Sequence, residues 1–179
     1  MVLPPQALAL TRTRLVHRDI IWAPWRMRYV GTPDEERPPG CVFCELPAQE
    51  DDPAAYILHR GRLAYVIMNL YPYNNGHLMI VPYSHVASLP AVEAEAAAEM
   101  IELTQLSQRV VQEAMRPQGF NIGMNQGSAA GAGIDQHLHM HLVPRWVGDT
   151  NFMPVLGDTR VMPQHLDETF DLLRKRFPG

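Results

Sequence analysis

The chain has no long hydrophobic run, no excess of basic residues and only two cysteines, and each shortage excludes a class of protein. No apolar run reaches the about 18–20 residues of a membrane span, so we expect no membrane partner. The 15 Lys and Arg against 19 Asp and Glu leave a net charge of −4, which argues against a nucleic-acid partner. An anionic ligand would therefore be held locally, by imidazoles, backbone amides and helix termini.

The N-terminal segment lacks the features of a targeting sequence. Met1–Leu10 has no basic stretch ahead of its apolar residues and no clear cleavage site, so we expect a cytoplasmic protein. Apolar residues make up 46% of the chain, which argues against disorder and allows one domain with a hydrophobic core. Because residues 1–40 are rich in Pro and Arg and show no sustained period, we interpret them as an N-terminal extension to a single domain at 41–179.

What is present is a series of short strands grouped around one long helix. Period-two alternation and turn residues predict strands at Ala55–His59, Leu63–Met68, His77–Pro82, Phe120–Met124 and Gln136–Pro144. Apolar residues at three- and four-residue spacing predict a long helix at Pro90–Met115 and a closing helix at Pro163–Phe177. We therefore expect an α+β domain, with an antiparallel sheet of about five strands packed with these helices.

Three histidines in the last predicted strand are the strongest functional signal. His137, His139 and His141 alternate with large apolar residues, so the three imidazoles should leave one face of the strand. Each imidazole carries two polar nitrogens that need partners, which predicts contact with a metal or a phosphate. In the phosphate case one imidazole attacks phosphorus while its neighbours stabilise the oxygens. A row satisfied only by backbone or water is the alternative.

Two neighbouring features add to this hypothesis. The loop Gln126–Gly133 has small side chains, so its backbone N–H groups could approach a ligand closely before the chain enters the histidine strand. Cys41 and Cys44 are separated by two residues, which in a reducing cytosol favours a metal site or a redox pair over a structural disulfide.

These residues resemble the motifs of the histidine triad (HIT) family. The similarity covers Trp22 to Asn151, and its most specific parts are Gly76-His77-x-x-x-x-Pro82-x-x-His85 and His137-x-His139-x-His141-Leu-Val-Pro144-Arg145. Within the family the chain is most similar to the Fhit branch and to bacterial members of the diadenosine tetraphosphate phosphorylase or hydrolase type. The segments that carry this closer similarity are Trp22-Ala-Pro-Trp25-Arg, Asn69-Leu-Tyr-Pro-Tyr and Val143-Pro-Arg-Trp146.

The resemblance implies a role for each matching residue. His139 would be the nucleophile that attacks the α-phosphorus of a dinucleoside polyphosphate and forms a covalent nucleotidyl-histidine. His141 would donate hydrogen bonds to phosphate oxygens, and His77 would support the triad. Asn69 would bind the ribose hydroxyls and Asn125 the phosphates. Water or inorganic phosphate would then release the nucleotide.

One departure from the family pattern concerns the phosphate contacts. Many members have Gln-Ser or Gln-Thr shortly before the first histidine, whereas this chain has Gly133-Ile-Asp-Gln136. The Gly133 amide and the Gln136 side chain are therefore our candidates for the missing phosphate contacts.

A structural zinc is also implied by the resemblance. The corresponding ligands are Cys41, Cys44, His85 and His137, a set that suits tetrahedral zinc. A reduced thiol pair and a redox motif are the alternatives. No organic cofactor is expected. Because related proteins commonly dimerise, we expect a homodimer that acts on small nucleotide substrates.

Other functions remain open at this stage. A Hint-like nucleoside phosphoramidase would act on an adenosine phosphoramidate. A noncatalytic nucleotide-binding protein would bind AMP without turnover. A metalloenzyme with all three histidines on one metal would lose activity on mild chelation.

Overall fold

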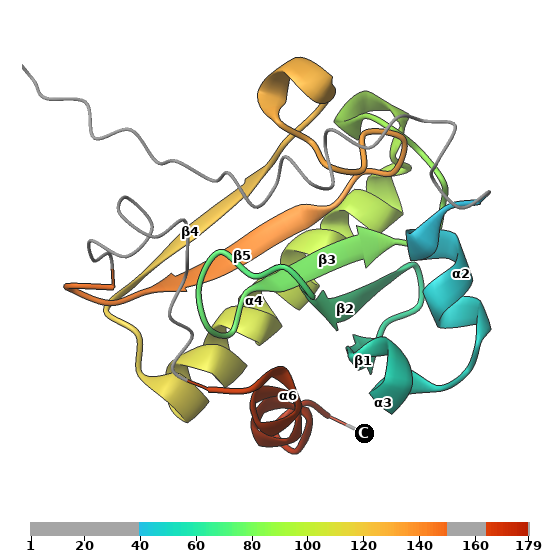
Figure 1. Cartoon of the computed structure of the whole chain (residues 1–179). Coiled ribbons are helices and arrows are strands. Elements are labelled where there is room, and N and C mark those ends of the chain that lie inside the picture. The colour runs from blue at the N-terminus through green and yellow to red at the C-terminus, as the bar shows by residue number, and fades with distance from the viewer. Residues whose placement is uncertain (1–39, 150–163, 179) are drawn as a thin grey trace, which may run out of the picture.

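The computed structural model describes residues 40–149 and 164–178, which form a five-stranded antiparallel sheet flanked by helices (Figure 1). The strands lie in the order β1-β2-β3-β5-β4. Their bounds are β1 Ile57–Arg60, β2 Ala64–Met68, β3 Leu78–Pro82, β4 Gly119–Met124 and β5 Met140–Arg145. The predicted α+β architecture is therefore confirmed.

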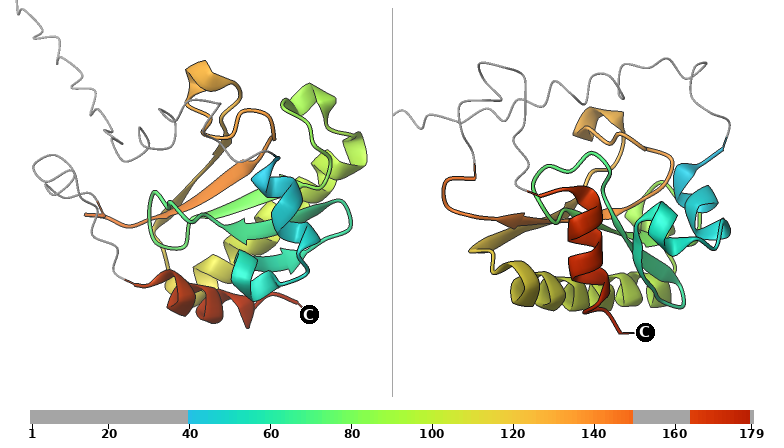
Figure 2. Two further views of the ribbon diagram at one scale, coloured as in Figure 1. Left: turned by 45° about the vertical axis from the view of Figure 1, so that its right-hand side comes forward. Right: turned by 60° about the horizontal axis from the view of Figure 1, so that its bottom comes forward.

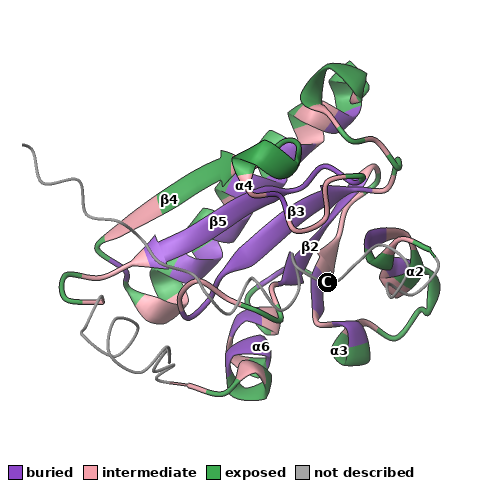
Figure 3. Ribbon diagram, turned by 45° about the horizontal axis from the view of Figure 1, so that its top comes forward, coloured by how far each residue is buried: buried purple, intermediate pink, exposed green. Residues whose placement is uncertain are grey.

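The helices divide between the two faces of the sheet (Figure 2). On one face the long helix α4 (Ala94–Met115) and the closing helix α6 (Leu166–Arg174) cover the larger core. On the other face the short helices α2 (Val42–Ala48) and α3 (Asp52–Ala55) contribute to a smaller core. The central strands β2, β3 and β5 are buried, while the residues of the edge strand β4 are exposed or half-buried (Figure 3).

The long helix begins later than the sequence predicts. Pro90 lies in a separate 3-10 turn, Leu89–Ala91, and Val92 and Glu93 are extended before α4 begins at Ala94. The backbone of Val92 is extended, and its side chain packs against the main core from this position before the helix begins. Ala96, Met100, Leu103 and Val110, which follow the three- and four-residue spacing that predicts this helix, are buried.

The predicted strand at Gln136–Pro144 is shortened from its N-terminal end. Regular pairing begins at Met140, which lies opposite Ile80 of β3 and Met124 of β4. Upstream, other bonds replace the ladder, because the Leu138 N–H donates to the Val86 carbonyl at 2.6 Å and the His137 carbonyl is bonded to an imidazole. His137 and His139 therefore precede the regular strand, and His141 alone lies within it.

Helices α2 and α3 were not predicted, and α2 depends on a contact from the sheet. Pro47 has no N–H, so it cannot donate to the carbonyl of Phe43 four residues before it. The buried hydroxyl of Tyr65 in β2 donates to that carbonyl at 2.7 Å. Tyr65 therefore fixes to the sheet the helix that carries the cysteines.

Some predictions fall outside the described residues. These are the extension 1–39, with its Trp22 to Arg26 motif, and the start of the closing helix at Pro163. Among the described residues, no helix combines the length and the apolar character needed to cross a membrane.

Candidate active site and metal centre

The three histidines lie on the same side of the sheet and are all buried, with exposed fractions of 0% for His137, 4% for His139 and 9% for His141. Phe43 of α2 contacts the ring of His137 at a centroid distance of 5.6 Å and that of His139 at 4.9 Å. The ring of His139 lies 4.8 Å from that of His141. The shared face follows the alternation in the sequence, although two of the three residues lie outside the strand.

His137 is oriented away from the other two histidines. Its Nε2 lies 2.9 Å from the carbonyl oxygen of Pro82. A carbonyl can only accept, so Nε2 carries the hydrogen and Nδ1 of the neutral ring has the lone pair. Burial lowers the pKa of His137, against the opposing effect of the Pro82 carbonyl, and this favours the neutral ring that a metal ligand needs.

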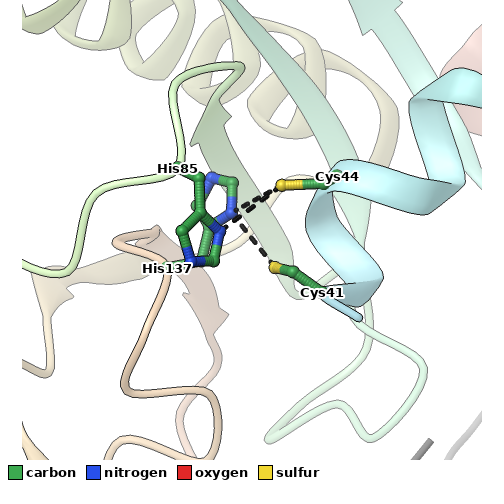
Figure 4. Close-up of side chains that lie close together, drawn as sticks. All are labelled: Cys41, Cys44, His85 and His137. Atoms are coloured by element: carbon green, nitrogen blue, oxygen red, sulfur yellow. Dashed lines mark hydrogen bonds between the residues drawn. The ribbon is translucent and has the colours of Figure 1, made fainter. Parts of the chain in front are cut away.

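The lone pair of His137 points at the two cysteines (Figure 4). Its Nδ1 lies 3.2 Å from Cys41 Sγ and 3.6 Å from Cys44 Sγ, and Cys44 Sγ lies 3.4 Å from His85 Nδ1. Cys41 precedes the first residue of α2, and its carbonyl accepts from the Cys44 N–H at 2.9 Å. This helical turn places both thiols toward the histidines.

The four side chains fit a tetrahedral zinc. Their ligand atoms all lie within 4.8 Å of one another. Zinc bonds of about 2.0–2.3 Å in tetrahedral geometry put neighbouring ligand atoms roughly 3.3–3.8 Å apart. Three of the pairs, at 3.2, 3.4 and 3.6 Å, are already close to this range. The Pro82 carbonyl that holds His137 is the kind of outer partner that orients a metal-binding imidazole.

The surroundings of Cys44 disfavour the ionisation of its thiol. Burial, followed by the neighbouring Cys41, raises the pKa of the Cys44 thiol. A divalent cation would reverse this effect, because metal binding releases the thiol protons. The donor set and its charge requirement thus both suit a cation at this position.

His139 is held in the opposite tautomer from His137. Its Nδ1 lies 2.9 Å from the carbonyl oxygen of His137, so Nδ1 carries the hydrogen and Nε2 has the lone pair. An imidazole with this arrangement can act as a nucleophile through Nε2. The carbonyl that orients it belongs to a member of the Cys/His cluster, so the two sites share one peptide.

His141 is oriented by a chain of hydrogen bonds that begins at the backbone. The Tyr73 N–H donates to His77 Nδ1 at 3.1 Å, which leaves the His77 hydrogen on Nε2. His77 Nε2 lies 2.9 Å from His141 Nδ1 and therefore donates to it. The hydrogen of His141 is then on its own Nε2.

The arrangement has a clear chemical capacity. One imidazole, His139, has a lone pair on Nε2, while its neighbour His141 carries an N–H donor on the same nitrogen. Such a pair can attack an electrophilic phosphorus atom and donate to the oxygen that gains charge. A single metal bound by all three histidines does not fit, because His137 turns its lone pair to the cysteines.

The predicted nucleotide-binding residues divide into two groups. Asn69 lies beside the site, with its Nδ2 3.4 Å from His77 Nδ1 and its Oδ1 accepting the Tyr71 N–H at 2.9 Å. Asn125 follows the end of β4, and Gln136 is exposed and contacts only Asp135 by side-chain hydrogen bond at 3.4 Å. Within residues 40–149 and 164–178, no hydrogen bond joins Asn125, Gly133 or Gln136 to the triad.

Sequence reasoning missed four groups that contact the imidazoles and orient them. They are the Pro82 carbonyl, the His137 carbonyl, the Tyr73 amide and the ring of Phe43. The first three are backbone groups, which no side-chain pattern reveals. The only available signal was the position of Phe43 between Cys41 and Cys44.

Fold and site together define a class of α+β proteins in which a His-x-His-x-His segment meets the sheet beside a Cys/His cluster. The chain belongs to the HIT domain family, whose model matches residues 51–147. It is 42% identical over 159 residues to the AP-4-A phosphorylase of Mycobacterium tuberculosis, covering 86% of this chain and 81% of that protein. It is 26% identical over 105 residues to the adenosine 5'-monophosphoramidase hnt1 of Schizosaccharomyces pombe, covering 59% of this chain and 74% of that protein.

A solved structure supports the fold. A zinc-bound histidine triad family protein from Mycobacterium smegmatis aligns with a TM-score of 0.63 and 29% identity, covering 76% of this chain and 92% of that one. The expected family and fold are therefore confirmed.

Proposed function

We propose that the protein cleaves dinucleoside polyphosphates of the diadenosine tetraphosphate type at the α-phosphate, through a covalent nucleotidyl-His139. The observation that carries this proposal is the pair of opposite tautomers at His139 and His141. The ring with the nitrogen that can attack and the ring with the nitrogen that can donate lie 4.8 Å apart between centroids, which suits a two-step displacement at phosphorus. The 42% identity to a protein named AP-4-A phosphorylase supports the substrate class.

In the first step, His139 Nε2 attacks the α-phosphorus. An N–P bond forms as the bridging P–O bond breaks, and diadenosine tetraphosphate releases ATP. The His137 carbonyl stabilises the positive charge that develops on the ring, because it already accepts the Nδ1 hydrogen at 2.9 Å. His141 Nε2–H donates to a phosphate oxygen, where negative charge increases. In this proposal Asn69, whose Nδ2 lies 3.4 Å from His77 Nδ1, binds the ribose hydroxyls.

In the second step, an acceptor oxygen attacks the phosphorus of adenylyl-His139 from the side opposite His139 Nε2. The P–N bond breaks and its electron pair returns to His139 Nε2. Inorganic phosphate as acceptor yields ADP, whereas water yields AMP. We favour phosphate, because the relative with 42% identity is named a phosphorylase.

The test is to incubate the protein with diadenosine tetraphosphate, with and without inorganic phosphate, and to identify the products. We expect ATP plus ADP, with turnover that depends on phosphate. ATP plus AMP at a rate independent of phosphate would assign a hydrolase. Selective turnover of adenosine phosphoramidate would instead favour the phosphoramidase alternative, in line with the similarity to hnt1. AMP binding without any covalent adduct would contradict an enzymatic role.

We further propose that Cys41, Cys44, His85 and His137 hold a structural zinc. Their geometry and the zinc-bound relative support this assignment. Such a metal would join α2, the segment after β3 and the segment before β5 into one unit. Metal analysis of the purified protein should find one zinc per chain, and its loss in Cys44→Ser tests the ligand set.

The homodimer remains a proposal. Ile122 on the edge strand β4 and Ile101 on α4 are about half exposed, at 46% and 49%, and an interface could cover them. Light scattering coupled to size exclusion should give twice the mass of the chain, and a mass of one chain would exclude a stable dimer.

A further inference from the structure

The segment Asn69–Gly76, between β2 and β3, orients one member of the triad, His141, through His77. The Tyr73 N–H donates to His77 Nδ1 at 3.1 Å, and Asn69 Nδ2 lies 3.4 Å from the same nitrogen. These donors place the His77 hydrogen on Nε2 and hence the His141 hydrogen on Nε2. Nothing within the His77 ring itself prefers one tautomer strongly. The orientation of His141 therefore depends on where the backbone of this segment lies.

The first tie on the segment comes from the end of β5. Asn74 Nδ2 donates to the Pro144 carbonyl at 3.1 Å and to Asp149 Oδ2 at 2.8 Å. Asp149 is in turn held by Arg145, whose Nε and Nη2 donate to its two oxygens at 2.7 and 2.8 Å. The Asp149 side chain is 9% exposed, and it also accepts the Trp146 N–H at 3.0 Å.

The second tie comes from α6, far away in the sequence. Thr169 Oγ1, which is fully buried, lies 3.1 Å from Asn75 Oδ1, and it also contacts Gln164 Oε1 and the His165 carbonyl. Asn75 Nδ2 donates to Gln164 Oε1 at 3.4 Å. The Thr169 hydroxyl has one hydrogen, which these acceptors share, so the contact is a small buried network.

We propose that Asp149 and Thr169 are positioning residues for the triad, which act by holding Asn74 and Asn75 so that the Tyr73 amide stays against His77. Neither residue would touch substrate. The inference rests on the proposed function, in which the His141 N–H stabilises phosphate. It assigns to the closing helix α6 a part in catalysis besides its packing on the core.

The test uses substitutions that keep side-chain size. Asp149→Asn leaves one acceptor oxygen for donors that now use two. Thr169→Val removes the hydroxyl and keeps the size of the side chain, whereas Thr169→Ser keeps the hydroxyl and removes only the methyl group. Thr104→Val is the matched control, because Thr104 is also a buried helical threonine that donates to the carbonyl four residues before it, but on α4. Its hydroxyl also lies 3.1 Å from Met140 Sδ, so this variant further controls for a change beside the histidine segment that leaves Asn74 and Asn75 in place.

Two readouts are compared in the full-length protein. Long-range ¹⁵N–¹H spectra of the imidazoles report which nitrogen of His141 carries the hydrogen, without any substrate. Turnover of diadenosine tetraphosphate reports kcat and KM separately. We expect Asp149→Asn and Thr169→Val to mix the His141 tautomers and to lower kcat by roughly 10- to 100-fold with little change in KM, since small misplacements of catalytic groups cost this much.

Thr169→Ser should recover the spectrum and most of kcat, and Thr104→Val should change neither, even where both valine variants lower Tm equally. Unchanged His141 signals in Asp149→Asn and Thr169→Val would overturn the inference, whatever their stability. If the signals shift but the wild-type protein cleaves no dinucleoside polyphosphate, the positioning role stands and the proposed function fails.

Discussion

His137 and His139 are two residues apart, yet the structure orients them in opposite senses. At His137 the Pro82 carbonyl accepts a hydrogen bond from Nε2–H, so the lone pair is on Nδ1 and faces the thiols. At His139 the His137 carbonyl accepts a hydrogen bond from Nδ1–H, so the lone pair is on Nε2. The same side chain and the same kind of partner thus give a lone pair that faces two thiols at one end of the segment and a lone pair on the opposite nitrogen at the other.

His141 follows a third arrangement. Its hydrogen is placed by another ring, His77, which takes its own orientation from a backbone amide. The comparison teaches that the type of residue sets what an imidazole can do, while the partner atom selects which nitrogen does it. If this is right, changes at the cluster end should affect stability, and changes at the triad end should affect turnover.

The largest effect is expected from His139→Ala. Losing the nucleophile removes the covalent step, so turnover of diadenosine tetraphosphate should fall by more than the about 10²–10³-fold that one oxyanion donor is worth. Zinc content and AMP binding should stay close to wild type. Mass spectrometry should show an adenylylated wild-type protein and no adduct in the variant. Retained catalysis would refute the assignment of the nucleophile.

A smaller loss is expected from His141→Ala. This variant keeps the His139 nucleophile but removes a donor to the phosphate oxygens, so kcat should fall by about 10²–10³-fold. Single-turnover kinetics should show slow formation of the adduct rather than its absence. An effect as large as that of His139→Ala would mean that the two histidines act as one unit.

Removing the metal tests the cluster end of the comparison. Where zinc exceeds its dissociation constant 100-fold, binding contributes about 2.7 kcal/mol to the folded state. At about 2–4 °C per kcal/mol, its removal should lower Tm by roughly 5–11 °C. Calorimetry before and after chelation, and of Cys44→Ser, measures this. Well below Tm, kcat per folded molecule should change little, and complete loss of turnover there would give the metal a direct part in catalysis.

Tyr65→Phe should affect stability without changing the metal or the triad. The Phe43 carbonyl receives no helical hydrogen bond from Pro47, which has no N–H, so this variant would remove its donor. An unsatisfied buried acceptor costs about 1–3 kcal/mol, so Tm should fall modestly while zinc content is unchanged. Tyr83→Phe is the control, because Tyr83 stacks on Tyr65 and its loss leaves the bond to Phe43 in place.

The same residue should affect stability at high pH. Burial raises the pKa of Tyr65 above the unfolded value of about 10, so the folded state keeps a proton that the unfolded chain loses. Its contribution is present below that pH and is lost as the pH rises above it. The free energy of unfolding measured with denaturant should therefore fall more steeply above pH 10 for wild type than for Tyr65→Phe. Equal slopes for the two proteins would contradict this.

Much of the fold was predictable, because core burial imposes a period on each element. Apolar spacing predicts all five strands and the helices α4 and α6, and the observed elements differ from these predictions at their ends. The errors have local causes. The strand at Gln136–Pro144 begins late because side-chain and loop bonds replace its ladder. Helix α2 was missed because it depends on Tyr65, which is distant in the sequence.

The chemical groups that the site offers can be read from the sequence: three alternating histidines, a fourth before β3, and a cysteine pair. Alternation correctly predicts that the imidazoles share one side, although only His141 lies within the strand. Which nitrogen of each ring carries the hydrogen depends on tertiary contacts. That choice is made by the carbonyls of Pro82 and His137 and the amide of Tyr73, and every residue type offers such atoms, so no sequence pattern can record it.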